Sequence, residues 1–68
     1  MIFNKMIEDL INIYSLENAN LILEDFEKNL LQTIMYKTNN ISKVSNYLNI
    51  SRNTLKSKLK KFNINGEN

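Results

Sequence analysis

Apolar side chains recur along this chain at intervals of three and four residues, which is the spacing of one face of an α-helix. The pattern predicts four helices, over about residues 4–16, 21–38, 41–48 and 52–62. Asparagine and serine separate these segments, whereas proline is absent and the one glycine is Gly66. We therefore expect an all-α fold, with a single domain over residues 1–68 and a frayed tail at 63–68.

The third and fourth predicted helices form a helix-turn-helix over about residues 40–62. Asn40 and Ser51 stand where each helix needs an N-cap, and Asn49 ends the third helix. Asparagine tolerates the positive φ that a tight turn requires. Seven apolar side chains of the pair can point inward together: Ile41, Val44, Leu48, Ile50, Leu55, Leu59 and Phe62. The polar side chains stay outside, so the last helix presents a strongly basic surface.

The two N-terminal helices, at about residues 4–38, have apolar faces broader than one neighbouring helix would cover. A domain of this size buries only about 60% of the surface that its unfolded chain exposes. Without Cys or His the chain has no disulfide and no zinc site to stabilise it. We therefore expect a homodimer, with these interface residues: Phe3, Ile7, Leu10, Tyr14, Ile22, Phe26 and Leu30. The alternative is an amphipathic hairpin packed on the rest of the same chain.

Charge is distributed unevenly along the chain. Residues 1–40 carry six acidic and three basic side chains, whereas residues 41–68 carry six basic and one acidic. The basic lysines could form an ordinary solvated helix face. However, no acidic residue lies between Glu27 and Glu67, so we expect these lysines to lack ion-pair partners, which favours binding to DNA. Glu24, Asp25 and Glu27 are expected in the exposed first turn of the second helix.

In a helix-turn-helix the second helix lies in the major groove, with its first residues at the base edges. The predicted base contacts are therefore Arg52, Ser51 and Asn53. Arg52 is the main one, because its guanidinium can pair with both O6 and N7 of a guanine. Phosphate contacts are expected from the surrounding polar and basic residues: Asn40, Ser42, Lys43, Lys56, Lys58 and Lys60.

Enzyme chemistry is not expected, because the chain has no imidazole base and no thiol nucleophile. One glycine cannot build a glycine-rich phosphate loop. We predict no cofactor, no metal and no small-molecule ligand. No apolar run reaches the roughly 18 residues of a membrane span, and Lys5, Glu8 and Asp9 interrupt the first apolar segment. A signal peptide is therefore not expected, and the predicted location is the cytoplasm, at the nucleoid.

The residues from Asn40 to Lys43, from Asn49 to Leu55, and Lys58-Leu59 resemble the helix-turn-helix of the Fis family. That family includes the factor for inversion stimulation and the C-terminal domains of NtrC-type enhancer-binding activators, and the similarity covers about residues 23–65. The resemblance implies a homodimer with interlocked N-terminal helices, whose two DNA-binding units enter successive major grooves and bend the duplex. It assigns base edges to Arg52 and Ser51, and phosphates to Asn40, Ser42, Thr54 and Lys56.

Four residues depart from the family pattern. Val44-Ser45 replaces two alanines, Asn49 replaces a glycine, and Ser57 replaces a residue that is often basic. The change at Ser57 should remove one phosphate contact and lower the salt dependence by about one unit of slope.

The expected function is that of a transcription regulator or nucleoid-associated factor that binds double-stranded DNA. The transcription machinery is a candidate protein partner. One alternative is the isolated C-terminal DNA-binding domain of an NtrC-type activator. Another is a helical protein-interaction module that uses the acidic N-terminal half of the chain.

Overall fold

The structure, a computed structural model, describes residues 2–65 and contains four α-helices and no strand in that range. The helices are α1 at Ile2–Tyr14, α2 at Ala19–Thr38, α3 at Ile41–Leu48 and α4 at Arg52–Lys61, and a short 3₁₀ helix, η1, covers Leu16–Asn18. The predicted all-α fold is confirmed. α3 has the predicted bounds, and α4 ends one residue early. α1 and α2 each begin two residues earlier than expected, and α1 also ends two residues earlier.

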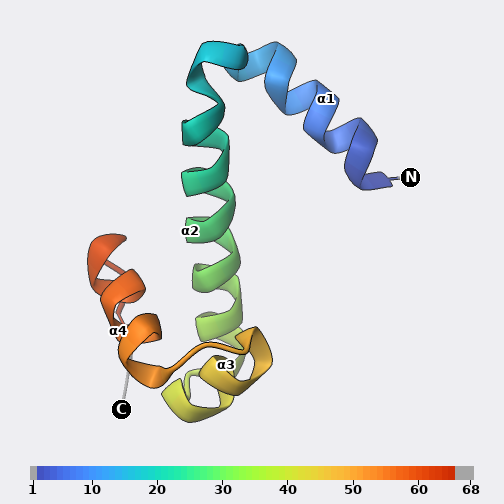
Figure 1. Cartoon of the computed structure of the whole chain (residues 1–68). Helices are drawn as coiled ribbons and strands as arrows, with labels where there is room; N and C mark the ends of the chain where they lie inside the picture. Colours follow the sequence, from blue (N-terminus) through green and yellow to red (C-terminus); the bar gives the residue numbers. More distant parts are fainter. Residues whose placement is uncertain (1, 66–68) are drawn as a thin grey trace.

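The 20 residues of α2 run through the whole molecule. Figure 1 shows α1 leaving one end of α2 while α3 and α4 pack around the other end. We call residues 2–30 the arm and residues 31–64 the head. The molecule measures 38 × 25 × 18 Å, with a radius of gyration of 13.6 Å. A compact domain of this length would have a radius of gyration of about 11 Å, so the chain is elongated.

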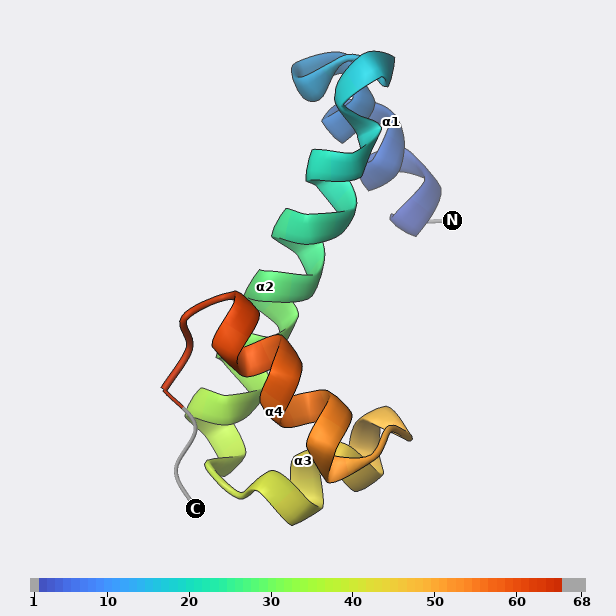
Figure 2. The ribbon, with the colours of Figure 1, turned by 60° about the vertical axis from the view of Figure 1, so that its left-hand side comes forward.

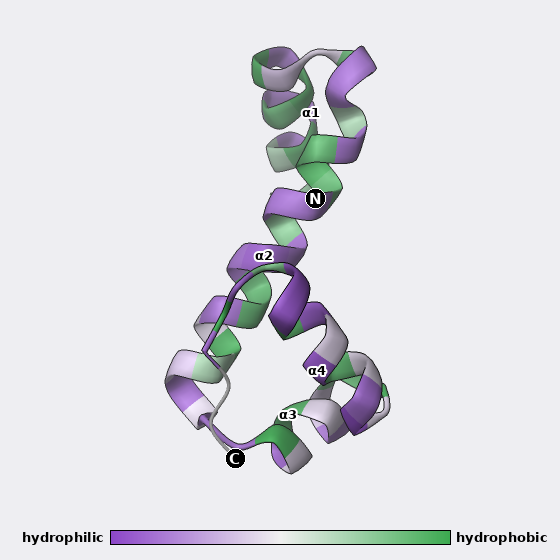
Figure 3. Ribbon diagram, turned by 90° about the vertical axis from the view of Figure 1, so that its left-hand side faces the viewer, coloured by the Kyte–Doolittle hydropathy of each residue, from purple (hydrophilic) through white to green (hydrophobic). Residues whose placement is uncertain are grey.

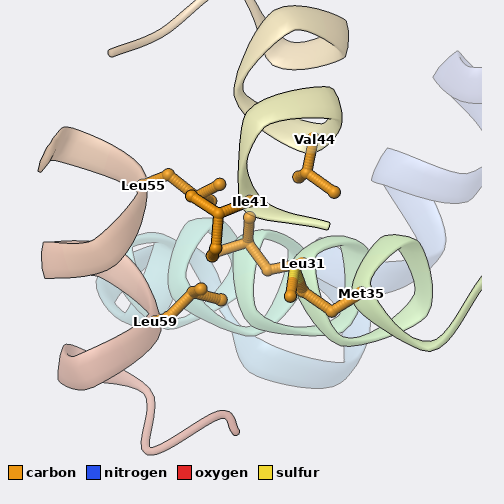
Figure 4. Packing of buried hydrophobic residues seen from close by; sticks show 6 residues of the cluster. All are labelled: Leu31, Met35, Ile41, Val44, Leu55 and Leu59. Atoms are coloured by element: carbon orange, nitrogen blue, oxygen red, sulfur yellow. The ribbon is translucent and has the colours of Figure 1, made fainter. Parts of the chain in front are cut away.

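The buried core lies entirely in the head. Figure 4 shows its six side chains meeting between three helices: Leu31 and Met35 of α2, Ile41 and Val44 of α3, and Leu55 and Leu59 of α4. Leu48, Ile50 and Phe62 are half-buried against them. All seven side chains of the helix-turn-helix that were predicted to point inward therefore do so. Each fully buried aliphatic side chain contributes about 1.5–3 kcal/mol to folding, and the cluster fixes α3 and α4 on α2.

Side-chain caps begin both helices of the helix-turn-helix. The Asn40 Oδ1 atom accepts a hydrogen bond of 3.0 Å from the backbone N–H of Lys43, and Ser51 Oγ accepts one of 3.0 Å from that of Thr54. Each bond satisfies an N–H that the helix leaves without an internal partner. The two predicted N-caps are confirmed.

An asparagine with positive φ ends each of these helices, Asn49 at φ 58° and Asn63 at φ 57°. The N–H of the following isoleucine then donates to a carbonyl five residues back, over 3.0 Å for Ile50 and 2.8 Å for Ile64. This is the Schellman arrangement, and both isoleucines pack against the core. The expectation of a frayed tail from residue 63 is therefore wrong for Asn63 and Ile64, whereas residues 66–68 lie outside the described range.

The arm leaves most of its apolar surface uncovered. α1 contains no buried residue, and Phe3 of α1 and Phe26 of α2 are 62% and 53% exposed. Figure 3 shows hydrophobic residues along α1 and on the N-terminal half of α2. Seven apolar side chains line a groove of about 270 Å³ between the two helices: Phe3, Met6, Ile7, Leu10, Ile22, Leu23 and Phe26. The single chain thus builds one well-packed body, the head, and one incompletely packed body, the arm.

The connection between α1 and α2 is tight and strained. Ser15 has φ 71° and ψ 155°, a combination that is essentially restricted to glycine and costs about 1–3 kcal/mol in another residue. The Asn18 amide holds the turn by donating to the Tyr14 carbonyl over 2.9 Å and to Ser15 Oγ over 3.3 Å. Tyr14 Oη also donates to Asp25 Oδ2 over 2.7 Å. This hydrogen bond to a carboxylate raises the pKa of the Tyr14 phenol above its usual value.

Candidate nucleic-acid interface

The first turn of α4 presents polar side chains to solvent, because its apolar positions begin only at Leu55. Arg52, Asn53 and Thr54 are all exposed. Ser51 Oγ accepts from the Thr54 backbone and donates to Thr54 Oγ1 over 2.9 Å, so the Ser51 hydroxyl is used in starting the helix. The hydroxyl hydrogen of Thr54 stays free to donate outward. A helix N-terminus with such donors favours an anionic group.

Arg52 is held from the neighbouring helix. Its Nη1 atom donates to Ser42 Oγ of α3 over 3.3 Å. A guanidinium has five N–H donors, so most of them remain available for a base edge. The Ser42 hydroxyl accepts this bond and can still donate its own hydrogen to a phosphate. Arg52 and Ser42, predicted separately as a base contact and a phosphate contact, are therefore neighbours at one edge of the helix-turn-helix.

Lysines extend this polar surface along α4 and onto α3. Lys56 and Lys60 are exposed one turn apart on α4, and Lys43 is exposed in the first turn of α3. None of the three forms an ion pair with a residue in the described range 2–65. Lys61, also exposed, lies 5.1 Å from the centre of the Phe62 ring. Free cations along a helix face suit a phosphate backbone.

Lys58 lies on a different side of α4. Its Nζ atom is 2.6 Å from Glu27 Oε2 of α2, so the expectation that these lysines lack acidic partners is wrong for Lys58. Glu27 is distant in the sequence, but the fold brings α2 beside α4. The helical spacing already indicated that Lys58 lies toward the inward side of α4, because it comes three residues after Leu55 and four before Phe62.

Comparison with known families identifies this architecture. Residues 22–62 match the model of the family described as bacterial regulatory protein, Fis family. The chain belongs to the Fis family. The matched range begins within α2 and ends directly after α4, so it contains the complete helix-turn-helix and nearly all of α2. No match was found among curated proteins or among solved structures.

Membership of the Fis family makes the chain a DNA-binding regulatory domain, with double-stranded DNA as its partner, and this family is not an enzyme family. No group of His, Cys, Asp and Glu side chains in the described residues could hold a metal ion. No helix of the described part is long and apolar enough to cross a membrane.

The structure explains how this Fis-family chain accommodates its unusual residues. Asn49 takes the left-handed conformation that the turn requires, as expected. Ser45 is buried where alanine is usual, but its Oγ donates to the Ser42 carbonyl over 2.9 Å, which satisfies the hydroxyl. Ser57 is exposed on α4 next to Lys56.

The acidic residues of α2 lie elsewhere than predicted. Because α2 begins at Ala19, its first turn contains no acidic side chain, and the expectation for Glu24, Asp25 and Glu27 is wrong. Asp25 instead accepts the hydrogen bond from Tyr14, and Glu27 pairs with Lys58. Two of the three carboxylates therefore connect elements of the fold. Sequence spacing alone missed these roles, because both partners belong to other helices.

Proposed function

We propose that this Fis-family chain is a homodimeric, sequence-preferring DNA-binding protein that recognises base edges in the major groove. In this proposal it bends the duplex and acts as a transcription regulator or nucleoid-associated factor in a bacterial cytoplasm. The observation that carries the proposal is the first turn of α4, where Arg52 and Asn53 are exposed beside Thr54 and a line of unpaired lysines.

The contacts follow from the positions of these side chains. Arg52 and Asn53 contact bases, because they lie in the first turn of α4, which approaches the base edges in a helix-turn-helix. Ser51 Oγ donates one hydrogen bond and accepts one at the start of α4. Its second lone pair can therefore accept a hydrogen bond from a base. The proposed phosphate contacts surround them: Asn40, Ser42, Lys43, Thr54, Lys56 and Lys60. Lys58 is left out, because Glu27 neutralises it.

The uncovered arm supports the dimer. The chain exposes 5503 Å², whereas a compact monomer of this mass exposes about 4,500 Å². The excess is comparable with the roughly 800 Å² that each partner buries in a standard interface. The proposed interface lies on the exposed or half-buried apolar side chains of the arm: Phe3, Ile7, Leu10, Tyr14, Ile22, Phe26 and Leu30. A hairpin packed fully on its own head would have covered them.

Selection of bound duplexes from a random pool tests the proposal. We expect a consensus with two related half-sites, about one helical turn apart. Affinity for the selected duplex should fall steeply with salt, because several phosphates are neutralised. A circular-permutation gel assay on the same duplex then measures bending. Equal affinity for all duplexes would contradict sequence preference, and a consensus with one half-site would contradict two-headed binding.

A further inference from the structure

One ion pair connects α4 to α2. The Lys58 Nζ to Glu27 Oε2 contact of 2.6 Å is the only ion pair within residues 2–65, and the side chains are 36% and 35% exposed. The two residues are 31 positions apart in the sequence. Partial burial shields the pair from solvent more than the other charged side chains of α4. The contact is therefore a defined link between two elements.

The Glu27 end of the pair lies beyond the hydrophobic attachment of α4, whereas Lys58 lies within the attached segment. α4 is fixed to the core through Leu55 and Leu59. Glu27 precedes the core residue Leu31 by one turn, about 6 Å along α2, and thus belongs to the arm. Figure 2 shows α4 crossing the C-terminal half of α2, with its last turn directed toward the middle of that helix. The ion pair therefore ties the head to the arm.

Fixing Lys58 also fixes the direction of the base-contacting end of α4. Arg52 precedes Lys58 by six residues, or about 9 Å of helix. Leu55 lies between them, and because α4 is a continuous helix, any small tilt that its core contacts still permit moves both ends together. A restraint on the C-terminal half of that helix restricts the movement of Arg52 at the other end.

We infer that Glu27 is a positioning residue for DNA recognition, which acts by holding Lys58 and so setting the angle of α4 to α2. In a homodimer this angle determines the separation of the two recognition helices, and hence the half-site spacing that the protein prefers. The inference rests on the proposed function, because a preferred spacing requires two heads. It gives Lys58 a role inside the protein in place of a phosphate contact.

The test measures binding to duplexes that carry the selected half-sites at spacings changed by one or two base pairs. Wild-type protein should prefer one spacing. Glu27→Gln keeps the size of the side chain and removes its charge, so affinity should fall at the preferred spacing and persist at the others. We expect the discrimination between spacings to decrease by about two- to tenfold, as two ion pairs of this exposure allow. Binding to a single half-site should be unchanged.

Glu24→Gln is the matched control, because it removes the same charge one turn away on α2, from an exposed side chain. It should leave the spacing preference intact. Lys58→Gln should weaken the preference as Glu27→Gln does, and the charge-exchanged double variant Glu27→Lys with Lys58→Glu should restore it. Circular dichroism of each variant should show the wild-type helix content, because the core does not include the pair.

Three results would overturn the inference. If Glu27→Gln keeps the wild-type spacing profile, Glu27 does not position α4, although the proposed function stands. If Lys58→Gln weakens binding at every spacing and lowers the salt slope while Glu27→Gln does neither, Lys58 contacts a phosphate. If the wild-type protein shows no preferred spacing, two-headed binding fails together with the inference.

Discussion

Arg52 combines exposure with restraint. The hydroxyl of Ser42 holds its guanidinium at the junction of α3 and α4, and Ser51 fixes the helix start from which it projects. A side chain that is already oriented loses less conformational freedom when it binds. In the proposed DNA complex, recognition at this position therefore depends on two serines as well as on the arginine.

Replacement of Arg52 by alanine should cost about 1–3 kcal/mol on the selected duplex and relax discrimination at one base position. Titrations with duplexes substituted at each position measure both effects. Arg52→Lys is the control, because it keeps the charge and loses the planar pair of donors. If alanine weakened binding equally on every sequence, Arg52 would be a phosphate contact.

Tyr14 should titrate above the usual tyrosine pKa of 10.0, because ionisation places a phenolate beside the Asp25 carboxylate. The neutral phenol is the favoured form in the folded state. The contribution of this contact to stability is thus complete below pH 10 and disappears as the pH rises through the raised pKa. Tyrosinate absorbance of the protein should include a step for Tyr14 at raised pH. Asp25→Asn should move that step to lower pH, and an unchanged titration would show that the contact does not form.

At the scale of elements, the helix-turn-helix could be predicted almost residue by residue, because its signals are local. Asn40 and Ser51 cap the helices that follow them, and Asn49 lies next to the residues it terminates. The start of α2 was less predictable, because Leu16–Asn18 forms a 3₁₀ turn held by contacts with α1. The Glu27–Lys58 pair could not be inferred without the arrangement of the helices.

Ser15→Gly should stabilise the protein by about 1 kcal/mol. Glycine adopts the backbone angles of Ser15 without steric cost, and this gain exceeds its larger loss of chain entropy. Thermal unfolding at fixed protein concentration measures the change. Ser15→Ala is the control, because it keeps the Cβ atom and should give no gain. A destabilised glycine variant would show that Ser15 is not strained in solution.

The whole molecule is divided between a head with a complete core and an arm without one. α2 is continuous through both, so any restraint on the arm is transmitted along a helix to the DNA-binding surface. We propose that a second chain completes the arm, which the area balance supports. In that dimer the preferred DNA geometry would depend on the arm as much as on the head.

Phe26→Glu should abolish association while leaving the head folded, because Phe26 is exposed in the single chain and lies in the proposed interface. Sedimentation equilibrium should give a dimer for the wild type and a monomer for the variant. Tyr36→Glu is the matched control, since Tyr36 is 91% exposed on the head side of α2. If the wild type also sedimented as a monomer at micromolar concentration, the proposed dimer would be wrong.

The continuity of α2 also has a consequence for the order of folding. The head core joins residues between Leu31 and Leu59, mostly over short loops, and such local contacts form quickly. The first turns of α2 lack this support in the single chain, and the proposed dimer would supply it. We therefore expect refolding, followed by stopped-flow circular dichroism, to show a fast phase independent of protein concentration. A slower phase, whose rate rises with concentration, should follow as the paired arms lengthen α2.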